Sequence, residues 1–196
     1  MDSTIIDFKN EKENVSVLFR EVQKMNQPWI WIVIAIPVAI FWYGAYQQLL
    51  LRKSFGNNPA PDWMLLLLFV AFGILLPLLF HSLKLVTEVR EDGLYVRFYP
   101  IHFSFKSFPF EKIQSHEVIT YNPIRDYGGW GIRYGLKGKA YNISGNRGLF
   151  FEFMEGKKVK KLMIGSQIPE KLSEAVRRGI KHRDTVNSAR FSGFSN

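Results

Sequence analysis

Two long apolar segments constrain this chain more than any other feature of its sequence. They cover residues 29–51 and 63–85, and the first 18 residues of each contain no charged side chain. An α-helix rises about 1.5 Å per residue, so a segment of this length crosses the hydrocarbon layer of a bilayer, which is about 30 Å thick. The sequence therefore predicts two transmembrane helices, joined by a short loop rich in Gly, Asn and Pro.

Aromatic residues gather near the ends of these segments. They are Trp29, Trp31, Trp42, Tyr43, Tyr46 and Trp63. Amphipathic rings favour the headgroup level of a membrane, so their positions predict interfacial belts. The alternative is that the rings pack between the two helices.

The lysines and arginines that flank the segments predict their orientation. Four lie before residue 29 and four between residues 84 and 106, whereas the connecting loop holds only Arg52 and Lys53. Because basic residues favour the cytoplasmic side, we expect a multi-pass protein of the cell membrane with both termini in the cytoplasm. The chain has no cysteine, which excludes disulfides and thiolate chemistry.

The excess positive charge lies entirely in the second part of the chain. Residues 1–83 contain six basic and six acidic side chains, whereas residues 84–196 contain twenty basic and eleven acidic ones, which leaves a net charge of +9. A domain held next to the inner leaflet meets anionic lipid first, so the charge favours membrane lipid over nucleic acid as a partner. The alternative is that this charge only enforces the topology.

Residues 1–28 contain an amphipathic pattern. Apolar residues recur at spacings of three and four, at Val15, Leu18, Phe19, Val22 and Met25. This spacing predicts an N-terminal amphipathic helix of about three turns. Such a helix either lies in the membrane interface or packs against the soluble domain.

After the second apolar segment the pattern changes to short alternating stretches. Glu91, Asp92 and Gly93 predict the turn of a β-hairpin between the first two of them. In all, the pattern predicts seven or eight β-strands, at residues 84–90, 94–99, 102–108, 111–121, 132–136, 139–144, 149–154 and 159–164.

A C-terminal helix and a tail complete the expected organisation. Pro169 and Glu170 are typical of a first helical turn, and we expect the helix to continue to about Lys181. Seven antiparallel strands closed by one helix predict a small, partly open barrel with the helix covering one end. The predicted fold is thus an α+β membrane protein, with the soluble domain at residues 86–183 and a disordered tail at 184–196.

Four features resemble those of bacterial pleckstrin-homology-like domains. They are the glycine-tryptophan segment at residues 127–133, the segment at 139–145, Gly148 at the start of a strand, and Ile164-Gly165-Ser166 followed by Pro169-Glu170. Their order resembles that in small prokaryotic membrane proteins with two helices before such a domain, and the resemblance covers residues 15–183. It implies a pleckstrin-homology-like barrel but supplies no activity, because that family is largely uncharacterised. Where related domains bind phosphoinositides through a basic turn, this chain has the acidic residues Glu91 and Asp92.

The candidate contact residues are basic or aromatic. They are Lys157, Lys158, Lys160, Lys161, Arg147 and Trp130. The lysine run either faces lipid, with Arg147 nearby, or is a solvated hairpin. Alternation along a strand places Lys158 and Lys160 on one face and Lys161 on the other. Trp130 is either a core anchor or an exposed contact.

No pattern in the sequence indicates an enzyme. The four histidines are scattered without metal-ligand spacing, and no nucleophile–base pair or phosphate loop is present. We therefore expect a membrane-anchored binding or scaffold module without metal or cofactor, which contacts anionic lipid or a protein partner. The alternatives are an accessory subunit of a membrane enzyme or transporter, and a structural homo-oligomer.

Overall fold

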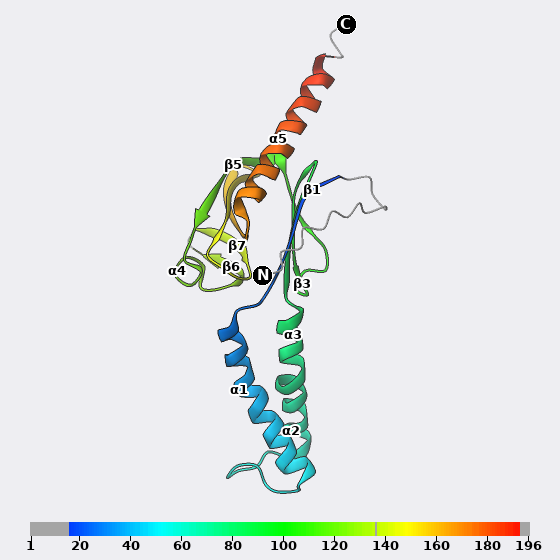
Figure 1. Ribbon diagram of the computed structural model, residues 1–196, viewed down its shortest axis with the longest axis vertical. Coiled ribbons are helices and arrows are strands. Elements are labelled where there is room, and N and C mark those ends of the chain that lie inside the picture. The colour runs from blue at the N-terminus through cyan, green and yellow to red at the C-terminus, as the bar shows by residue number, and fades with distance from the viewer. Residues whose placement is uncertain (1–15, 136, 193–196) are drawn as a thin grey trace. The chain divides into compact units, whose positions relative to one another are not determined.

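The computed structural model describes residues 16–135 and 137–192, which form two compact units (Figure 1). The helical unit comprises residues 25–83. The sheet unit is formed by the residues before 25 together with those from 84 onward. The chain is α+β with two long apolar helices, as predicted, and its strands form two β-sheets.

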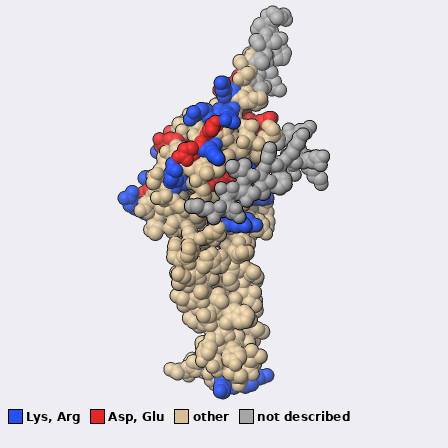
Figure 2. Space-filling view, in the orientation of Figure 1, with Lys and Arg blue, Asp and Glu red and all other residues tan. Residues whose placement is uncertain are grey.

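The helical unit contains two continuous helices. The first joins α1 (Pro28–Ala45) to the π-helical segment η1 (Tyr46–Leu50), and the second joins α2 (Asp62–Leu68), η2 (Phe69–Leu75) and α3 (Leu76–Ser82). By length and composition both could cross a membrane, which agrees with the predicted segments. Only 11% of the most apolar stretch of the second helix is buried. On the face shown in Figure 2 charged side chains lie at the loop end of this unit and none along its sides.

A hydrogen bond joins the two helices where a proline interrupts the second. Pro77 has no N–H to donate to the carbonyl of Gly73, four residues earlier. The indole of Trp42, on the first helix, donates to that carbonyl at 3.1 Å. The rings of Trp42 and Phe69 also meet edge to face, with their centroids 5.1 Å apart. The neighbouring helix thus satisfies a backbone group that the proline leaves without its usual donor.

The first sheet contains one strand that precedes the helical unit in the sequence and three strands that follow it. Its antiparallel order is β1 (Val17–Lys24), β2 (Lys84–Arg90), β3 (Gly93–Tyr99) and β4 (Lys106–Pro109). Lys24 lies opposite Lys84, so the helical unit connects two neighbouring strands (Figure 1). The predicted hairpin around the Glu91–Gly93 turn is confirmed.

The second sheet has five strands. They are β5 (Ile113–Thr120), β6 (Gly131–Gly135), β7 (Gly138–Asn142), β8 (Arg147–Glu155) and β9 (Lys158–Gly165). Their order is β5-β8-β9-β7-β6, and β7 pairs with β9 in parallel. The 3₁₀ turn η3 (Phe110–Lys112) connects the sheets. In place of the predicted seven-stranded, partly open antiparallel barrel, the strands form two sheets with one parallel pair and no closed barrel.

The helix α5 (Pro169–Ser192) contacts strands of both sheets. Its Leu172 and Val176 are fully buried, and its Gly179 leaves room for the ring of Phe110. The short helix α4 (Pro123–Tyr127) lies by the other face of the second sheet, where Tyr121, Tyr127, Ala140 and Met163 form a smaller cluster. The expectation of a disordered tail is wrong for residues 184–192, which continue α5, and residues 193–196 lie outside the described part.

The predicted N-terminal amphipathic helix is wrong, because residues 17–24 form strand β1. The buried side chains of β1 include Glu21 and Gln23, which are polar, whereas Leu18 is exposed. Glu21 accepts hydrogen bonds from Ser166 Oγ at 2.6 Å and Gln167 N at 2.8 Å. The Gln23 amide donates to the Gly165 carbonyl at 2.7 Å. The apolar spacing predicted a helix wrongly, because these polar hydrogen bonds determine which side chains of β1 face inward. Val15 lies outside the described residues.

Removal of the Glu21 carboxylate should weaken the attachment of β1. Burial raises the pKa of Glu21, although the bonds from Ser166 and Gln167 oppose the shift. Glu21→Ala leaves both donors without their acceptor, and we expect a loss of about 1–3 kcal/mol in the free energy of unfolding. Thermal unfolding of the full chain in detergent, followed by near-ultraviolet circular dichroism, measures this loss.

Glu21→Gln is the matched control, because it keeps an acceptor and cannot ionise. A raised pKa in the folded state means that the folded protein holds a proton which the unfolded chain has already released. The stability of the natural chain relative to Glu21→Gln should therefore fall as the pH rises from 4.5 through the raised pKa. A difference that does not change with pH contradicts this account.

The bond between Trp42 and Gly73 should matter only while Pro77 is present. We expect Trp42→Phe to reduce the stability of the helical unit by about 0.5–2 kcal/mol. Pro77→Ala restores a backbone N–H that can donate to Gly73, so Trp42→Phe should cost less in that background. Unfolding of the full chain in mixed detergent micelles measures both costs, and equal costs refute the compensation.

Candidate functional site

The predicted lysine run divides between two environments. Lys157 lies in the turn between β8 and β9, and Lys158 begins β9; both are exposed and lack an ion pair within the described residues. Lys160 pairs with Glu155, and Lys161 Nζ lies 3.7 Å from Glu152 Oε1. Lys160 and Lys161 line a cleft that Lys157 and Lys158 do not line.

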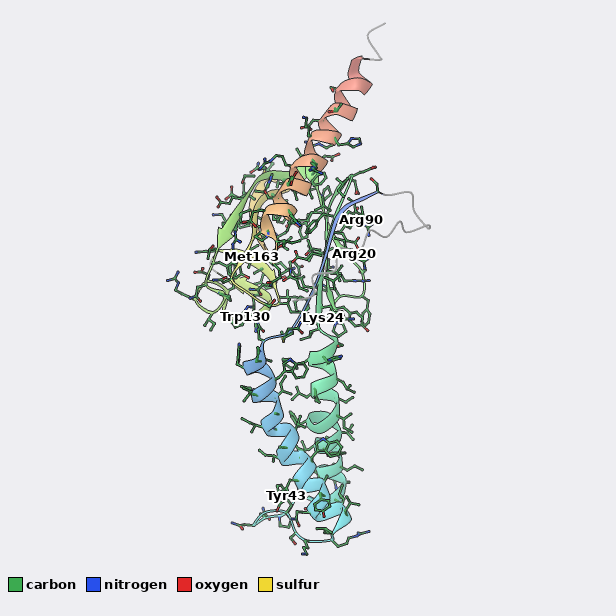
Figure 3. The ribbon with its side chains drawn as sticks, in the orientation of Figure 1. Arg20, Lys24, Tyr43, Arg90, Trp130 and Met163 are labelled. Carbon is green, nitrogen blue, oxygen red and sulfur yellow. The ribbon has the colours of Figure 1, made fainter. Side chains whose placement is uncertain are left out.

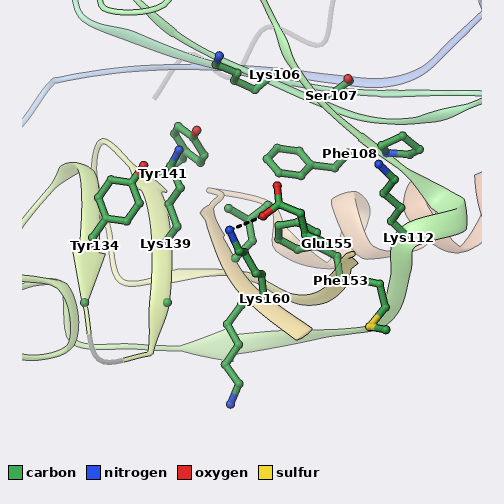
Figure 4. A pocket seen from close by; sticks show the side chains of 16 residues that line it. Lys106, Ser107, Phe108, Lys112, Tyr134, Lys139, Tyr141, Phe153, Glu155 and Lys160 are labelled. Atoms are coloured by element: carbon green, nitrogen blue, oxygen red, sulfur yellow. Dashed lines mark ion pairs between the residues drawn. The ribbon is translucent and has the colours of Figure 1, made fainter. Parts of the chain in front are cut away.

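This cleft is a concave feature of the sheet unit. It lies between β4 and the strands β7, β8 and β9, and its volume is about 590 Å³ (Figure 4). The side chains that give it its character are Lys106, Phe108, Lys112, Tyr134, Lys139, Tyr141, Phe153, Glu155, Lys160 and Lys161. It thus combines five lysines and four aromatic rings with one carboxylate. We call it the lysine cleft.

The lysine cleft begins where the apolar core ends. Along β9, Ile164 and Leu162 are buried and Lys160 is exposed; these alternate residues share one side of the strand. Along β8, Leu149 and Phe151 are buried and Glu155 is exposed in the same row. On each of these strands, the side that carries buried apolar residues in the core therefore carries a charged residue at the cleft.

Lys139 lies over two aromatic rings of the cleft. Its Nζ is 4.7 Å from the ring centroid of Tyr141 and 5.1 Å from that of Tyr134. Burial opposes the charged form, but the contacts with the tyrosine hydroxyls outweigh it and raise the pKa of Lys139. This side chain therefore stays protonated at neutral pH.

His102 indicates a positive potential at the edge of the cleft. Its ring meets Tyr141 edge to face, with centroids 5.8 Å apart. Burial lowers the pKa of His102, and the charges of Lys106 and Lys139 lower it further. The potential that disfavours a proton on His102 favours an anion in the same place.

Three lysines of the cleft form no close ion pair within the described residues, although Lys112 acts on Glu155 at longer range. Within the part of the chain that the structure describes, no carboxylate lies within ion-pair distance of Lys106, Lys112 or Lys139. Sequence reasoning missed these residues because 33 positions separate Lys106 from Lys139 and only the fold brings their strands together. The available signal was the pairing of a lysine with an aromatic residue two positions later, as in Lys106–Phe108 and Lys139–Tyr141.

The other predicted contact residues lie outside the lysine cleft. Arg147 forms an ion pair with Glu170 at the start of α5. Trp130 is half-buried, between glycines with positive φ values at positions 129 and 131, and its indole donates to the Gly145 carbonyl at 3.0 Å. The tryptophan therefore fixes one loop against another and keeps part of its ring exposed.

A second surface lies at the end of the sheet where the chain enters and leaves the helical unit. Lys24, Lys84 and Tyr99 lie side by side there on β1, β2 and β3, and we call this end the exit edge. The loop that follows β3 exposes apolar side chains: Tyr99 is 39% exposed, Ile101 59% and Phe103 80%. Within the sheet unit, Lys24 and Trp130 lie at the same end, and Arg90 marks the other (Figure 3).

Comparison with known proteins identifies a family without adding an activity. Among the residues that the structure describes, no group of histidine and carboxylate side chains could hold a metal ion. No curated protein and no solved structure matches the chain. The model of the family described as "Family of unknown function (DUF6141)" matches residues 10–181, so the chain belongs to that family.

Proposed function

We propose that the protein is a membrane-anchored binding module whose sheet unit acts at the cytoplasmic lipid surface. The observation that carries the proposal is the pairing of β1 with β2 across the helical unit. Both strands continue directly into the apolar helices, so the anchor holds the sheet unit by two neighbouring points. A single flexible tether would leave the domain free to turn away from the bilayer.

The connections at the exit edge are short. Three residues separate Lys24 from Pro28, and only Leu83 separates Ser82 from Lys84. An extended chain spans at most about 3.6 Å per residue, so Lys24 stays within roughly 14 Å of the first helix. If the helices cross a bilayer, the exit edge must remain close to the headgroups.

The composition of the exit edge suits such a place. Tyr99, Ile101 and Phe103 expose apolar and aromatic surface, and Lys24 and Lys84 add positive charge beside it. Aromatic rings favour the interface, and lysines near anionic lipid contribute about 1 kcal/mol each. We therefore propose that the loop at residues 99–103 contacts the lipid surface.

The lysine run at residues 157–161 occupies a different place on the sheet unit. Gly165, at one end of β9, bonds to Gln23 beside the exit edge. Lys158 begins the other end of β9, about 23 Å away at 3.3 Å per residue. This distance supports the exit edge, rather than the lysine run, as the surface that contacts lipid.

We also propose that the sheet unit is a divergent pleckstrin-homology-like domain. Two sheets, a C-terminal helix that contacts both of them, and the glycine-tryptophan segment support this assignment. The parallel pairing of β7 with β9 and the helical insertion after β1 are departures from the barrel expected from the resemblance.

The proposed orientation predicts which residues an impermeant thiol reagent reaches. The chain has no native cysteine, so single substitutions can be labelled in intact cells. With both termini inside, Asn57→Cys in the loop between the helices should be labelled, and the exposed Lys158→Cys should be labelled only after the cells are opened. The reverse pattern contradicts the orientation.

Lipid contact at the exit edge predicts a local change of polarity. A polarity-sensitive fluorophore on Phe103→Cys, in the full chain in nanodiscs, should emit at shorter wavelength than the same label on Lys158→Cys. Nitroxide-bearing lipids should quench the label at position 103 and spare the label at 158. Equal, unquenched emission from both positions would remove lipid contact and favour a protein partner or a homo-oligomer.

A further inference from the structure

The lysine cleft has the size and opening of a ligand site. Its volume of about 590 Å³ lies within the range of small-molecule pockets, which is about 300–1,000 Å³. It opens between the two sheets, and residues of five strands line it: β4, β6, β7, β8 and β9 (Figure 4).

The charges of the cleft favour an anion. Five lysines line it, and its single carboxylate, Glu155, pairs with Lys160. Lys106 and Lys139 form no ion pair with a carboxylate in the described part of the chain, and Lys112 acts on Glu155 only at longer range. A charge on the inward side of a strand can also serve to prevent association of sheet edges. That role alone does not require lysines from three elements to meet around one cavity.

The inner wall of the cleft is apolar. The rings of Phe108 and Phe153 meet edge to face with centroids 5.5 Å apart, and Leu162 and Tyr141 are buried beside the cavity. A small inorganic anion would use the lysines and leave this wall uncovered. A ligand that fits both parts has an anionic group joined to an apolar body.

We propose that the lysine cleft binds an amphipathic anion, with a phosphate or carboxylate group at Lys106 and Lys139 and a hydrocarbon body against Phe108 and Phe153. The shared chemistry can come from a free amphiphile or from a lipid of the surrounding bilayer. The site goes beyond the proposed function, because its geometry lies within the sheet unit and does not depend on contact with the membrane.

The test is a calorimetric titration of the full chain in nanodiscs of phosphatidylcholine. Hexyl phosphate is the probe, and inorganic phosphate and hexanol carry its head and its tail separately. We expect hexyl phosphate to bind and each half to bind at least about tenfold more weakly, because each loses one set of contacts. Equal affinity for inorganic phosphate, or no binding of hexyl phosphate, overturns the proposal.

Matched variants locate the binding. Lys106→Gln/Lys139→Gln should weaken hexyl phosphate binding by about tenfold or more, since a hydrogen bond to a charged group is lost at each position. Lys157→Gln/Lys158→Gln makes the same change of charge outside the cleft and should leave the affinity within about twofold. Equal losses in the two variants refute the assignment to the cleft.

A gain of affinity provides a test that misfolding cannot imitate. Glu155→Gln removes the only carboxylate of the cleft and frees Lys160, so hexyl phosphate should bind several-fold more tightly. Weaker or unchanged binding by this variant contradicts the proposed position of the anion.

Nanodiscs that contain phosphatidic acid distinguish the two sources of ligand. If a bilayer lipid enters the cleft, it will compete with hexyl phosphate and lower its apparent affinity in the natural chain more than in Lys106→Gln/Lys139→Gln. If the ligand is a free amphiphile, the two proteins will respond equally to the added lipid. Failure of lipid contact at Phe103 would leave these titrations unaffected, so the two proposals fail separately.

Discussion

The pairing of β1 with β2 is the interaction on which the rest of the structure depends. These strands are neighbours in the sheet, yet the 59 residues of the helical unit separate them in the sequence. The entropy of closing so long a connection grows only slowly with its length, and two helices that pack together bring their ends close. The pairing then makes the anchor part of the domain, because neither strand can leave the sheet without breaking the ladder from residue 17 to 24.

Polar contacts, more than apolar burial, hold β1 in its register. A shift by one residue would turn Glu21 and Gln23 away from Ser166, Gln167 and Gly165 and expose their buried partners. Burial of a carboxylate is unfavourable, as the raised pKa of Glu21 shows, so these residues reduce the net gain from attaching β1. In return they make the alternative registers less stable, which matters for a strand at the edge of its sheet.

Sequence reasoning found the parts of the fold that depend on local pattern. The apolar helices follow from length and absence of charge, and β2, β3 and β5 to β9 follow from alternation and turn residues. The strand predicted at residues 102–108 is strand only from Lys106, where β4 begins. Sequence reasoning failed at β1. The apolar residues there recur at the spacing of a helix, whereas the residues that the strand buries include Glu21 and Gln23. The reasoning also failed for the lysine cleft, since Lys106, Lys112 and Lys139 lie on separate elements and meet only through the fold.

The loop after β3 contributes to both proposed surfaces. Phe103 and Ile101 expose their side chains beside the exit edge, whereas His102, between them, turns to the ring of Tyr141 at the lysine cleft. A movement of the loop at the lipid surface would therefore also move His102 and alter the potential shared with Lys106 and Lys139. Any effect of binding at one surface on the affinity of the other would be the same factor in each direction. The short distance along the chain between Phe103 and His102 makes this loop the physical element through which such coupling would act.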